Sequence, residues 1–123
     1  MSIESMDINN IAMGVILNAG DARMCIDEAM DAMASMDFDL VDAKIAEADA
    51  KILEAHKAQT ETIQRQAAGE DVEYSLLFTH AQDTLMTISA ELHMTKKMLP
   101  VVKVLAARSD CYLDTNESLG DNS

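Results

Sequence analysis

The sequence contains little of what a β-sheet core or a membrane span requires. Only 3% of its 123 residues are aromatic, none is Trp, and one is Pro. The core must therefore be built from aliphatic residues and the ten Met. Ala, Leu and Met favour helices, whereas strands enrich aromatic and β-branched residues. No apolar run approaches the roughly 18 residues that span a bilayer. These absences favour a small helical protein of one domain.

Positive charge is also scarce. The chain has 22 acidic and 9 basic side chains, a formal charge of −13. Because this charge repels phosphate backbones and anionic membrane surfaces, it argues against nucleic acid as a partner and against direct membrane insertion. A basic or apolar protein surface would be attracted instead.

Two further features bear on the compartment. The N-terminus MSIESMDINN lacks the positive charge and apolar stretch of a signal peptide. The two cysteines, Cys25 and Cys111, do not have the close spacing of a metal or redox pair, so we interpret both as free thiols of a reducing compartment. We therefore expect a cytoplasmic protein.

Apolar residues recur at steps of three and four in two long segments, the spacing that lines one face of a helix. The first segment runs from Asp7 to about Met33, and the second from Phe38 to about Ala67. Between them, Ser35-Met36-Asp37 offers side chains that cap the free amides of a new helix. The pattern predicts two long amphipathic helices joined by a short turn.

A third helix is predicted after the break at Ala68-Gly69-Glu70-Asp71, where Gly suits a helix end and acidic residues suit a helix start. It should begin between Val72 and Ser75. Pro100 lies in this segment, and a bend or restart is expected there. The apolar stripe of this helix consists of Leu77, Ala81, Leu85, Ile88, Leu92, Leu99 and Val102.

Three helices with short connections predict an all-α fold, an antiparallel three-helix bundle formed by residues 1–107 as a single domain. After Arg108 the sequence SDCYLDTNESLGDNS is acidic and has no apolar periodicity. Such a segment buries too little apolar surface to offset its ordering entropy. We therefore expect residues 108–123 to form a disordered acidic tail.

A polar stripe lies beside the apolar stripe of the third helix. Most stripes of this kind are solvated faces and carry no chemistry. This one contains an imidazole, carboxylates and hydroxyls at steps of three and four. Its members are His80, Asp83, Thr84, Thr87 and Glu91.

The residues around His80 change this interpretation. The stretch SLLFTHAQDTLMT at Ser75 to Thr87 is similar to VSLLLVHAQDHLMT, the active-site signature of the lactose/cellobiose/diacetylchitobiose class of IIA components in sugar phosphotransferase systems. NAGDAR at Asn18 to Arg23 and EAHKAQTETIQ at Glu54 to Gln64 also resemble stretches of that family. The three matches fall in three predicted helices, in the order and at the separations of the family, and together they are highly specific.

The resemblance implies that the chain is a phosphocarrier and counts as a phosphotransferase component. A phosphoryl group would come from the histidine-containing phosphocarrier protein, rest on His80, and pass to a cysteine of the IIB component. The membrane IIC component would then carry a β-linked disaccharide, which the IIA component does not contact. Imidazole suits this role because one nitrogen is neutral and nucleophilic near neutral pH.

The resemblance also implies a homotrimer with a shared metal. The family's residue at the position of Asp83 lies on a threefold axis, where three copies bind one divalent ion, expected here to be Mg²⁺. Three carboxylates brought together without a cation would repel one another, and Mg²⁺ accepts oxygen ligands. The metal site and the trimer are therefore predicted together.

Gln82 and His56 are candidate supporting residues. Gln82 belongs to the His80 motif and would orient or contact the phosphoryl group, although a solvated amide is an equal interpretation. His56 would lie near His80 across a subunit boundary, or would simply be an exposed helical His. Thr84 replaces a second His of the family motif, which removes a titratable neighbour one turn from His80.

Two other classes of function compete with the phosphocarrier. The same bundle could serve as a non-catalytic regulatory or interaction protein, and loss of His80 or Asp83 would have favoured that alternative. A carboxylate-bridged redox bundle would need paired Glu-x-x-His motifs, which this chain lacks.

Overall fold

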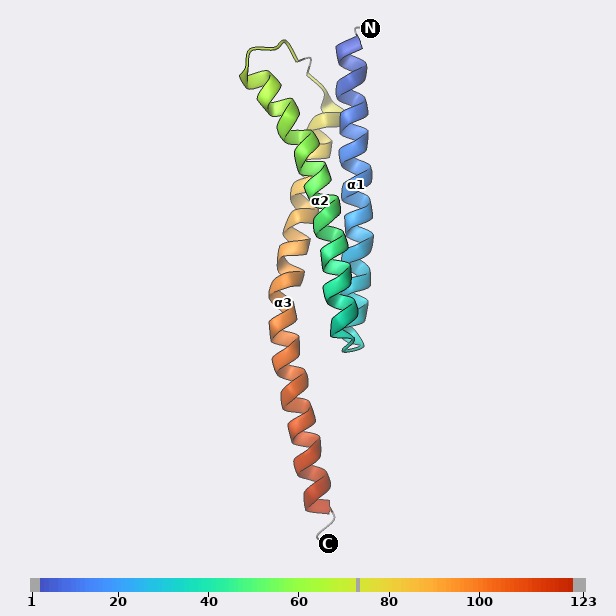
Figure 1. Cartoon of the computed structure of the whole chain (residues 1–123), viewed down its shortest axis with the longest axis vertical. Coiled ribbons are helices and arrows are strands. Elements are labelled where there is room, and N and C mark those ends of the chain that lie inside the picture. The colour runs from blue at the N-terminus through green and yellow to red at the C-terminus, as the bar shows by residue number, and fades with distance from the viewer. Residues whose placement is uncertain (1–2, 73, 121–123) are drawn as a thin grey trace.

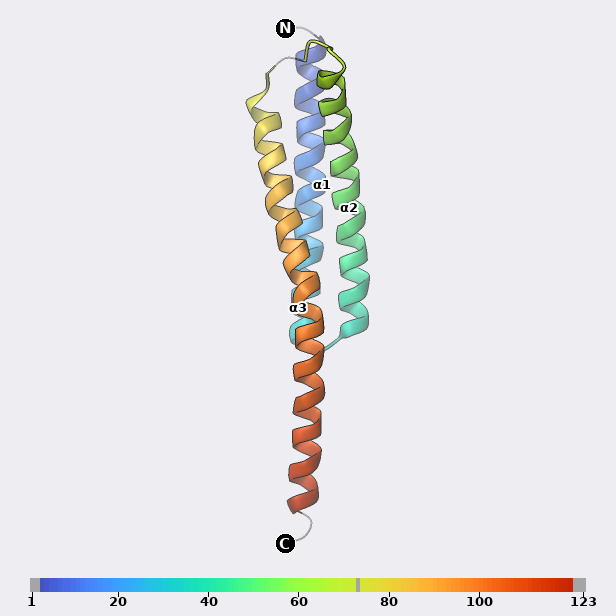
Figure 2. The same cartoon turned by 90° about the vertical axis from the view of Figure 1, so that its left-hand side faces the viewer.

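The computed structural model describes the backbone of residues 3–72 and 74–120, and the side chains of residues 7–72 and 74–110. This part of the chain contains no strand and folds into three helices, α1 (Ile3–Ala34), α2 (Phe38–Ala67) and α3 (Leu76–Gly120). Successive helices run in opposite directions, so that α1 and α3 are parallel and α2 is antiparallel to both (Figure 1; Figure 2). The predicted all-α three-helix bundle is confirmed.

The turn between α1 and α2 is closed by backbone hydrogen bonds. The Met36 amide donates to the Met33 carbonyl at 3.0 Å, and the Asp37 amide donates to the Ala32 carbonyl at 2.9 Å. This is a Schellman motif, which requires a left-handed residue, and Met36 has φ +58°. The predicted cap is formed by Asp37, whose carboxylate accepts from the Leu40 amide at 3.3 Å.

α2 also ends in a Schellman motif, with a Gly in the left-handed position, which a residue without Cβ adopts readily. Gly69 has φ +88° and its amide donates to the Gln66 carbonyl at 3.1 Å. At the start of α3, one residue later than the predicted range, the Ser75 hydroxyl accepts from the Phe78 amide at 3.1 Å. The same hydroxyl donates to Asn9 Oδ1 at 2.8 Å, which ties the first turn of α3 to α1.

The buried face of α3 follows an unbroken heptad pattern, with steps that alternate between three and four. Every member is buried or half-buried, most of them against α1, which contacts both other helices more extensively than they contact each other. We call this row the inner row. It consists of Phe78, Ala81, Leu85, Ile88, Leu92, Thr95, Leu99, Val102 and Ala106.

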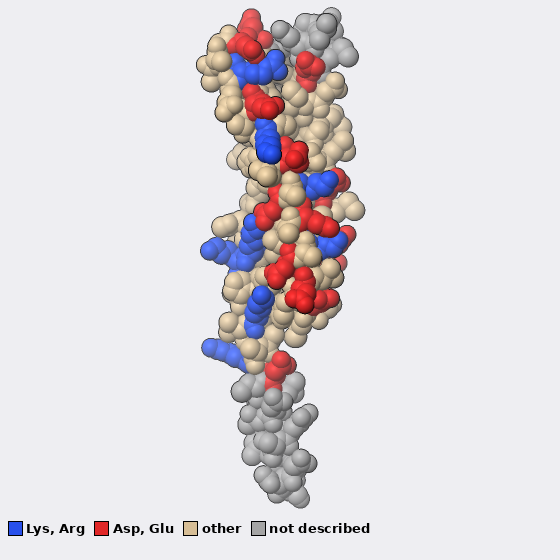
Figure 3. Space-filling model, in the orientation of Figure 1, with Lys and Arg blue, Asp and Glu red and all other residues tan. Residues whose placement is uncertain are grey.

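The facing rows of α1 and α2 are rich in small residues. In α1 the buried positions include Ala12, Ala19 and Ala22, and in α2 they include Ala48 and Ala55. Small side chains allow helix axes to approach closely, so that the larger residues of the inner row fill the space between them. The outer surface of the bundle carries most of its charged side chains (Figure 3).

The prediction of a disordered tail is wrong for residues 108–120. The structure continues α3 through Pro100 and on to Gly120, and residues 121–123 lie outside the described part. Extending an existing helix adds one hydrogen bond per residue without a new nucleation cost, whereas Pro removes a single donor. A segment with weak apolar periodicity can therefore remain helical when a long helix leads into it.

Met36 should limit the stability of the bundle, because an L residue with a side chain costs about 1 kcal/mol in the left-handed region. We predict that Met36→Gly raises the free energy of unfolding by about 1 kcal/mol. Thermal and urea denaturation would measure this change. Met13→Gly, an exposed Met inside α1, is the control and should lower stability by a similar amount. A loss of stability in both variants would contradict the account of this turn.

Candidate functional site

The packing of α3 decides which side chains of the predicted site face outward. The inner row buries Ala81 and Leu85, so the opposite face of the same turns carries the polar stripe. His80 and Asp83 are exposed, and Thr84 is half-buried at the edge of the core. The structure therefore brings His80 and Asp83 to one open surface, one helical turn apart.

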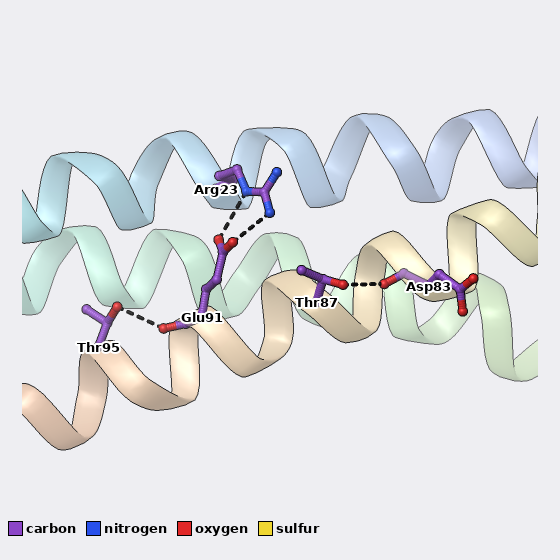
Figure 4. A network of polar contacts seen from close by, with 5 residues as sticks. All are labelled: Arg23, Asp83, Thr87, Glu91 and Thr95. Atoms are coloured by element: carbon purple, nitrogen blue, oxygen red, sulfur yellow. Dashed lines mark hydrogen bonds and ion pairs between the residues drawn. The ribbon is translucent and has the colours of Figure 1, made fainter.

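At the C-terminal end of the polar stripe, Glu91 forms a bidentate ion pair with Arg23 of α1 (Figure 4). Arg23 Nε donates to Glu91 Oε2 at 3.0 Å, and Nη2 donates to Oε1 at 2.6 Å. The pKa of the Arg23 guanidinium is raised, chiefly by its hydrogen bond to Glu91. Planar two-point pairing fixes geometry better than a single contact does. The pair thus sets the axial register of α1 against α3, and it occupies the Glu91 carboxylate.

The hydroxyls of the stripe are directed to the backbone. Thr84 Oγ1 donates to the His80 carbonyl at 2.9 Å, and Thr87 Oγ1 donates to the Asp83 carbonyl at 2.9 Å. Such bonds from Thr to the carbonyl four residues earlier are common inside helices. Within the described residues, no hydrogen bond or ion pair engages the His80 imidazole or the Asp83 carboxylate. Both groups are free for an external partner.

The two candidate supporting residues are not brought to His80 within one chain. Gln82 is half-buried, and residues two apart on a helix point to different faces. His56 is exposed on α2, and no hydrogen bond joins it to His80 in the described part of the chain. Their predicted roles remain predictions that concern a partner or a second subunit.

The structure draws attention to two polar residues that sequence reasoning did not single out. Arg23, in the NAGDAR stretch, makes the ion pair to α3 described above. The Gln59 side-chain oxygen is buried without a hydrogen-bond partner among the described residues. In the sequence, a Gln inside an otherwise apolar stripe indicates such a buried amide. Leaving a buried oxygen without a hydrogen bond costs free energy, so a polar partner is expected for it.

The described part of a single chain does not build a metal site. Residues 7–72 and 74–110 contain no group of three or more His, Cys, Asp or Glu side chains placed to hold an ion. The exposed Asp83 carboxylate offers a hard oxygen ligand of the kind that Mg²⁺ accepts. The residue type therefore fits a divalent cation, and within the described residues Asp83 offers this ligand alone.

Cys25 is not a competing nucleophile. Its thiol is half-buried and donates to Glu47 Oε2 at 3.5 Å. Burial and then this carboxylate raise the pKa of the Cys25 thiol, although the nearby Lys44 ammonium lowers it. A thiol held in the protonated form is a poor nucleophile. The side chain of Cys111 lies outside the described residues.

Among the described residues, none of the helices combines the length and apolar character needed to cross a bilayer.

Comparison with known proteins agrees with the motifs. The family described as "PTS system, Lactose/Cellobiose specific IIA subunit" matches residues 10–103. The lactose-specific EIIA component of Staphylococcus epidermidis is 34% identical over 97 residues, which cover 79% of this chain and 93% of that protein.

Solved structures show the same relationship. The cellobiose-specific enzyme IIA of Bacillus anthracis superimposes with a TM-score of 0.78 at 34% identity, over 87% of this chain and 94% of that one. The IIA component in the solution structure of the IIA(chitobiose)–HPr complex of the N,N′-diacetylchitobiose system gives a TM-score of 0.72 at 26% identity, over 80% and 96%. The chain belongs to the lactose/cellobiose-specific IIA family of the sugar phosphotransferase system.

Proposed function

We propose that this chain carries a phosphoryl group on His80 between the histidine-containing phosphocarrier protein and the cysteine of a IIB component. The observation that supports this most strongly is the free, exposed imidazole of His80 within the family motif, on a helix held rigidly by its buried face. A relative solved in complex with HPr supports a donor of that class.

The transfer is a pair of in-line displacements at phosphorus. A lone pair of the His80 imidazole attacks the phosphorus of the donor's phosphohistidine, and the donor's P–N bond breaks as its imidazole leaves. In the second step a IIB thiolate attacks, the P–N bond at His80 breaks, and a P–S bond forms. Each step conserves the phosphoryl group and needs no other reactant, so that positioning and charge neutralisation supply the catalysis.

The position of His80 on α3 favours the charged product. Helical side chains lean toward the N-terminus of their helix, so a phosphoryl group on His80 lies over the first turn of α3. The free amides of that turn carry partial positive charge and stabilise an anion by about 0.3–1 kcal/mol. No Lys or Arg occurs on α3 before Lys96. Between its start and Lys96, α3 itself therefore offers no basic side chain to the transferring group.

We further propose that the active form is a homotrimer. The Asp83 carboxylates of the three chains would bind one divalent ion, which we propose to be Mg²⁺. The exposed and unpaired carboxylate of Asp83 on the outer face of α3 supports this arrangement. When bound, the ion would neutralise three carboxylates that otherwise repel one another.

The proposed setting is the cytoplasm, beside a membrane IIC component that moves a β-linked disaccharide. His80 would exchange its group only with proteins, so the chain itself does not contact the sugar. The relatives compared above carry lactose, cellobiose and diacetylchitobiose in their names, which is consistent with a IIA component that does not select the sugar.

Replacing the proposed nucleophile tests phosphoryl transfer. Wild-type protein incubated with phosphoenolpyruvate, the general phosphotransferase enzyme and its histidine phosphocarrier should gain one acid-labile adduct of about 80 Da by intact mass, as expected for a histidine nucleophile. His80→Gln should gain none. His93→Gln, an exposed His on the same helix, is the matched control and should gain the adduct. An adduct on His80→Gln, or none on wild type with active partners, would refute the proposal.

Removal of the proposed metal ligand tests the shared ion. Native mass spectrometry in Mg²⁺ should find one ion for every three wild-type chains and none in Asp83→Asn, because the amide replaces the charged ligand. Asp110→Asn, which changes another exposed carboxylate of α3, should keep the ion. Trimers of Asp83→Asn that retain one ion would show that the metal is held elsewhere.

A further inference from the structure

His80 lies close to the start of α3. The helix begins at Leu76, and residues 70–72, 74 and 75 before it form no helix or strand. Only residues 76–79 therefore separate this connecting segment from His80. The first amides of a helix have no partner within it, so a helix end frays unless side chains hold it. The direction of the His80 imidazole thus depends on what holds the first turn.

Ser75 closes the first turn of α3. Its hydroxyl accepts a hydrogen bond from the Phe78 amide at 3.1 Å. Its carbonyl accepts from the Thr79 amide at 3.2 Å and from Thr79 Oγ1 at 3.3 Å. A hydroxyl that accepts from an amide three residues later is a favoured helix cap. Ser75 therefore holds the backbone of the two residues that directly precede His80.

The same hydroxyl ties this turn to α1. Ser75 Oγ donates to Asn9 Oδ1 at 2.8 Å, and the two residues are 66 apart in the sequence. A hydroxyl has one proton and two lone pairs, so that of Ser75 accepts from Phe78 and donates to Asn9 at the same time. The first turns of α3 lie beside the N-terminal half of α1 (Figure 1; Figure 2). Asn9 therefore fixes the height of the first turn of α3 along α1.

This tie is nearer to His80 than the Arg23–Glu91 pair is. Glu91 lies about 16 Å from His80 along the helix axis at 1.5 Å per residue, whereas Ser75 is less than half as far away. Apolar burial below His80 fixes the rotation of α3, but apolar contacts are non-directional, whereas a hydrogen bond has a preferred length and angle. Of the two polar contacts between α1 and α3 described above, the Ser75–Asn9 bond thus bears more directly on the position of the imidazole.

We propose that Asn9 and Ser75 are positioning residues for phosphoryl transfer, and that the hydrogen bond between them holds the first turn of α3 so that His80 meets the donor's phosphorus in line. The proposal rests on the proposed function of His80. Displacement at phosphorus requires alignment, and a misplacement of about 1 Å can slow a reaction by about 100-fold. Asn9 lies just outside residues 10–103, which match the family. The tie therefore joins the His80 motif to a residue that the match does not include.

Substitutions at Asn9 separate the tie from the helix cap. Asn9→Ala removes the acceptor on α1 and leaves the Ser75 cap in place, whereas Ser75→Ala removes both. Asn9→Asp keeps an acceptor oxygen at the same position and should restore the hydrogen bond. Asn10, the next residue of α1, is also exposed. Asn10→Ala and Asn10→Asp are therefore matched controls for the loss of an amide and for the added negative charge.

Single-turnover kinetics on the full chain tests the proposal, with the phosphorylated histidine phosphocarrier protein as the donor. Rapid quench and intact mass over a range of donor concentrations separate the limiting rate constant from the half-saturating donor concentration. Asn9→Ala and Ser75→Ala should lower the limiting rate constant roughly tenfold, because alignment is lost after docking, and should leave the half-saturating concentration unchanged. Asn9→Asp and both Asn10 variants should react at the wild-type rate. Circular dichroism at the assay temperature checks that each variant is folded, since a role in stability alone would not slow a folded chain.

The outcomes that overturn the proposal are distinct from those that overturn the phosphocarrier function. A wild-type limiting rate constant in Asn9→Ala would refute the positioning role alone, as would a loss that Asn9→Asp does not restore or that Asn10→Ala shares. A change confined to the half-saturating concentration would assign the pair to docking, and an unfolded Asn9→Ala would assign it to the fold; either result contradicts the proposal. If wild type gains no phosphoryl group from an active donor, the proposed function fails and the positioning role fails with it.

Discussion

The structure depends on the burial of the inner row of α3 against α1 and α2. Each large member of this row, such as Leu85 or Ile88, stabilises the fold by roughly 1.5–3 kcal/mol when it is removed from water. Because the row repeats every seven residues without a break, it fixes the rotation of α3 about its axis over most of its length. The position of every other side chain on α3 follows from that rotation. His80 and Asp83 face outward because the inner row faces inward.

Burial of the inner row fixes the rotation of α3 but not its position along α1. Polar contacts between α1 and α3 set that position, the axial register of the two helices. The Ser75–Asn9 hydrogen bond and the Arg23–Glu91 pair lie at two levels of the same helix pair. Both are exposed, and exposed pairs contribute little free energy. Their effect is on which turns of α1 and α3 lie side by side. The imidazole of His80 is therefore presented at a fixed height and direction to a docking protein.

The sequence predicted the bundle well, for identifiable reasons, and it supplied the two residues on which the proposed site rests. The predicted ends of α2 were correct because Asp37 and Gly69 are specific signals for a helix start and a helix end, respectively. His80 and Asp83 were found through a motif, since an exposed polar stripe alone usually has no function. The Arg23–Glu91 pair could not be predicted, because it joins residues 68 apart whose meeting depends on the register of two helices. The error at residues 108–120 arose because apolar periodicity reports burial, whereas a continuing helix needs no burial of its own.

The central claim is that α3 has two faces, one that folds the bundle and one that meets partners. Amide hydrogen exchange measured along α3 at two protein concentrations tests it most directly. The account predicts that amides between Phe78 and Leu92 are protected equally at both concentrations. Amides beyond Ala106, the last residue with a buried side chain in the described part, should exchange faster than these at both concentrations. Equal protection of the two regions would contradict the account, as would rapid exchange between Phe78 and Leu92.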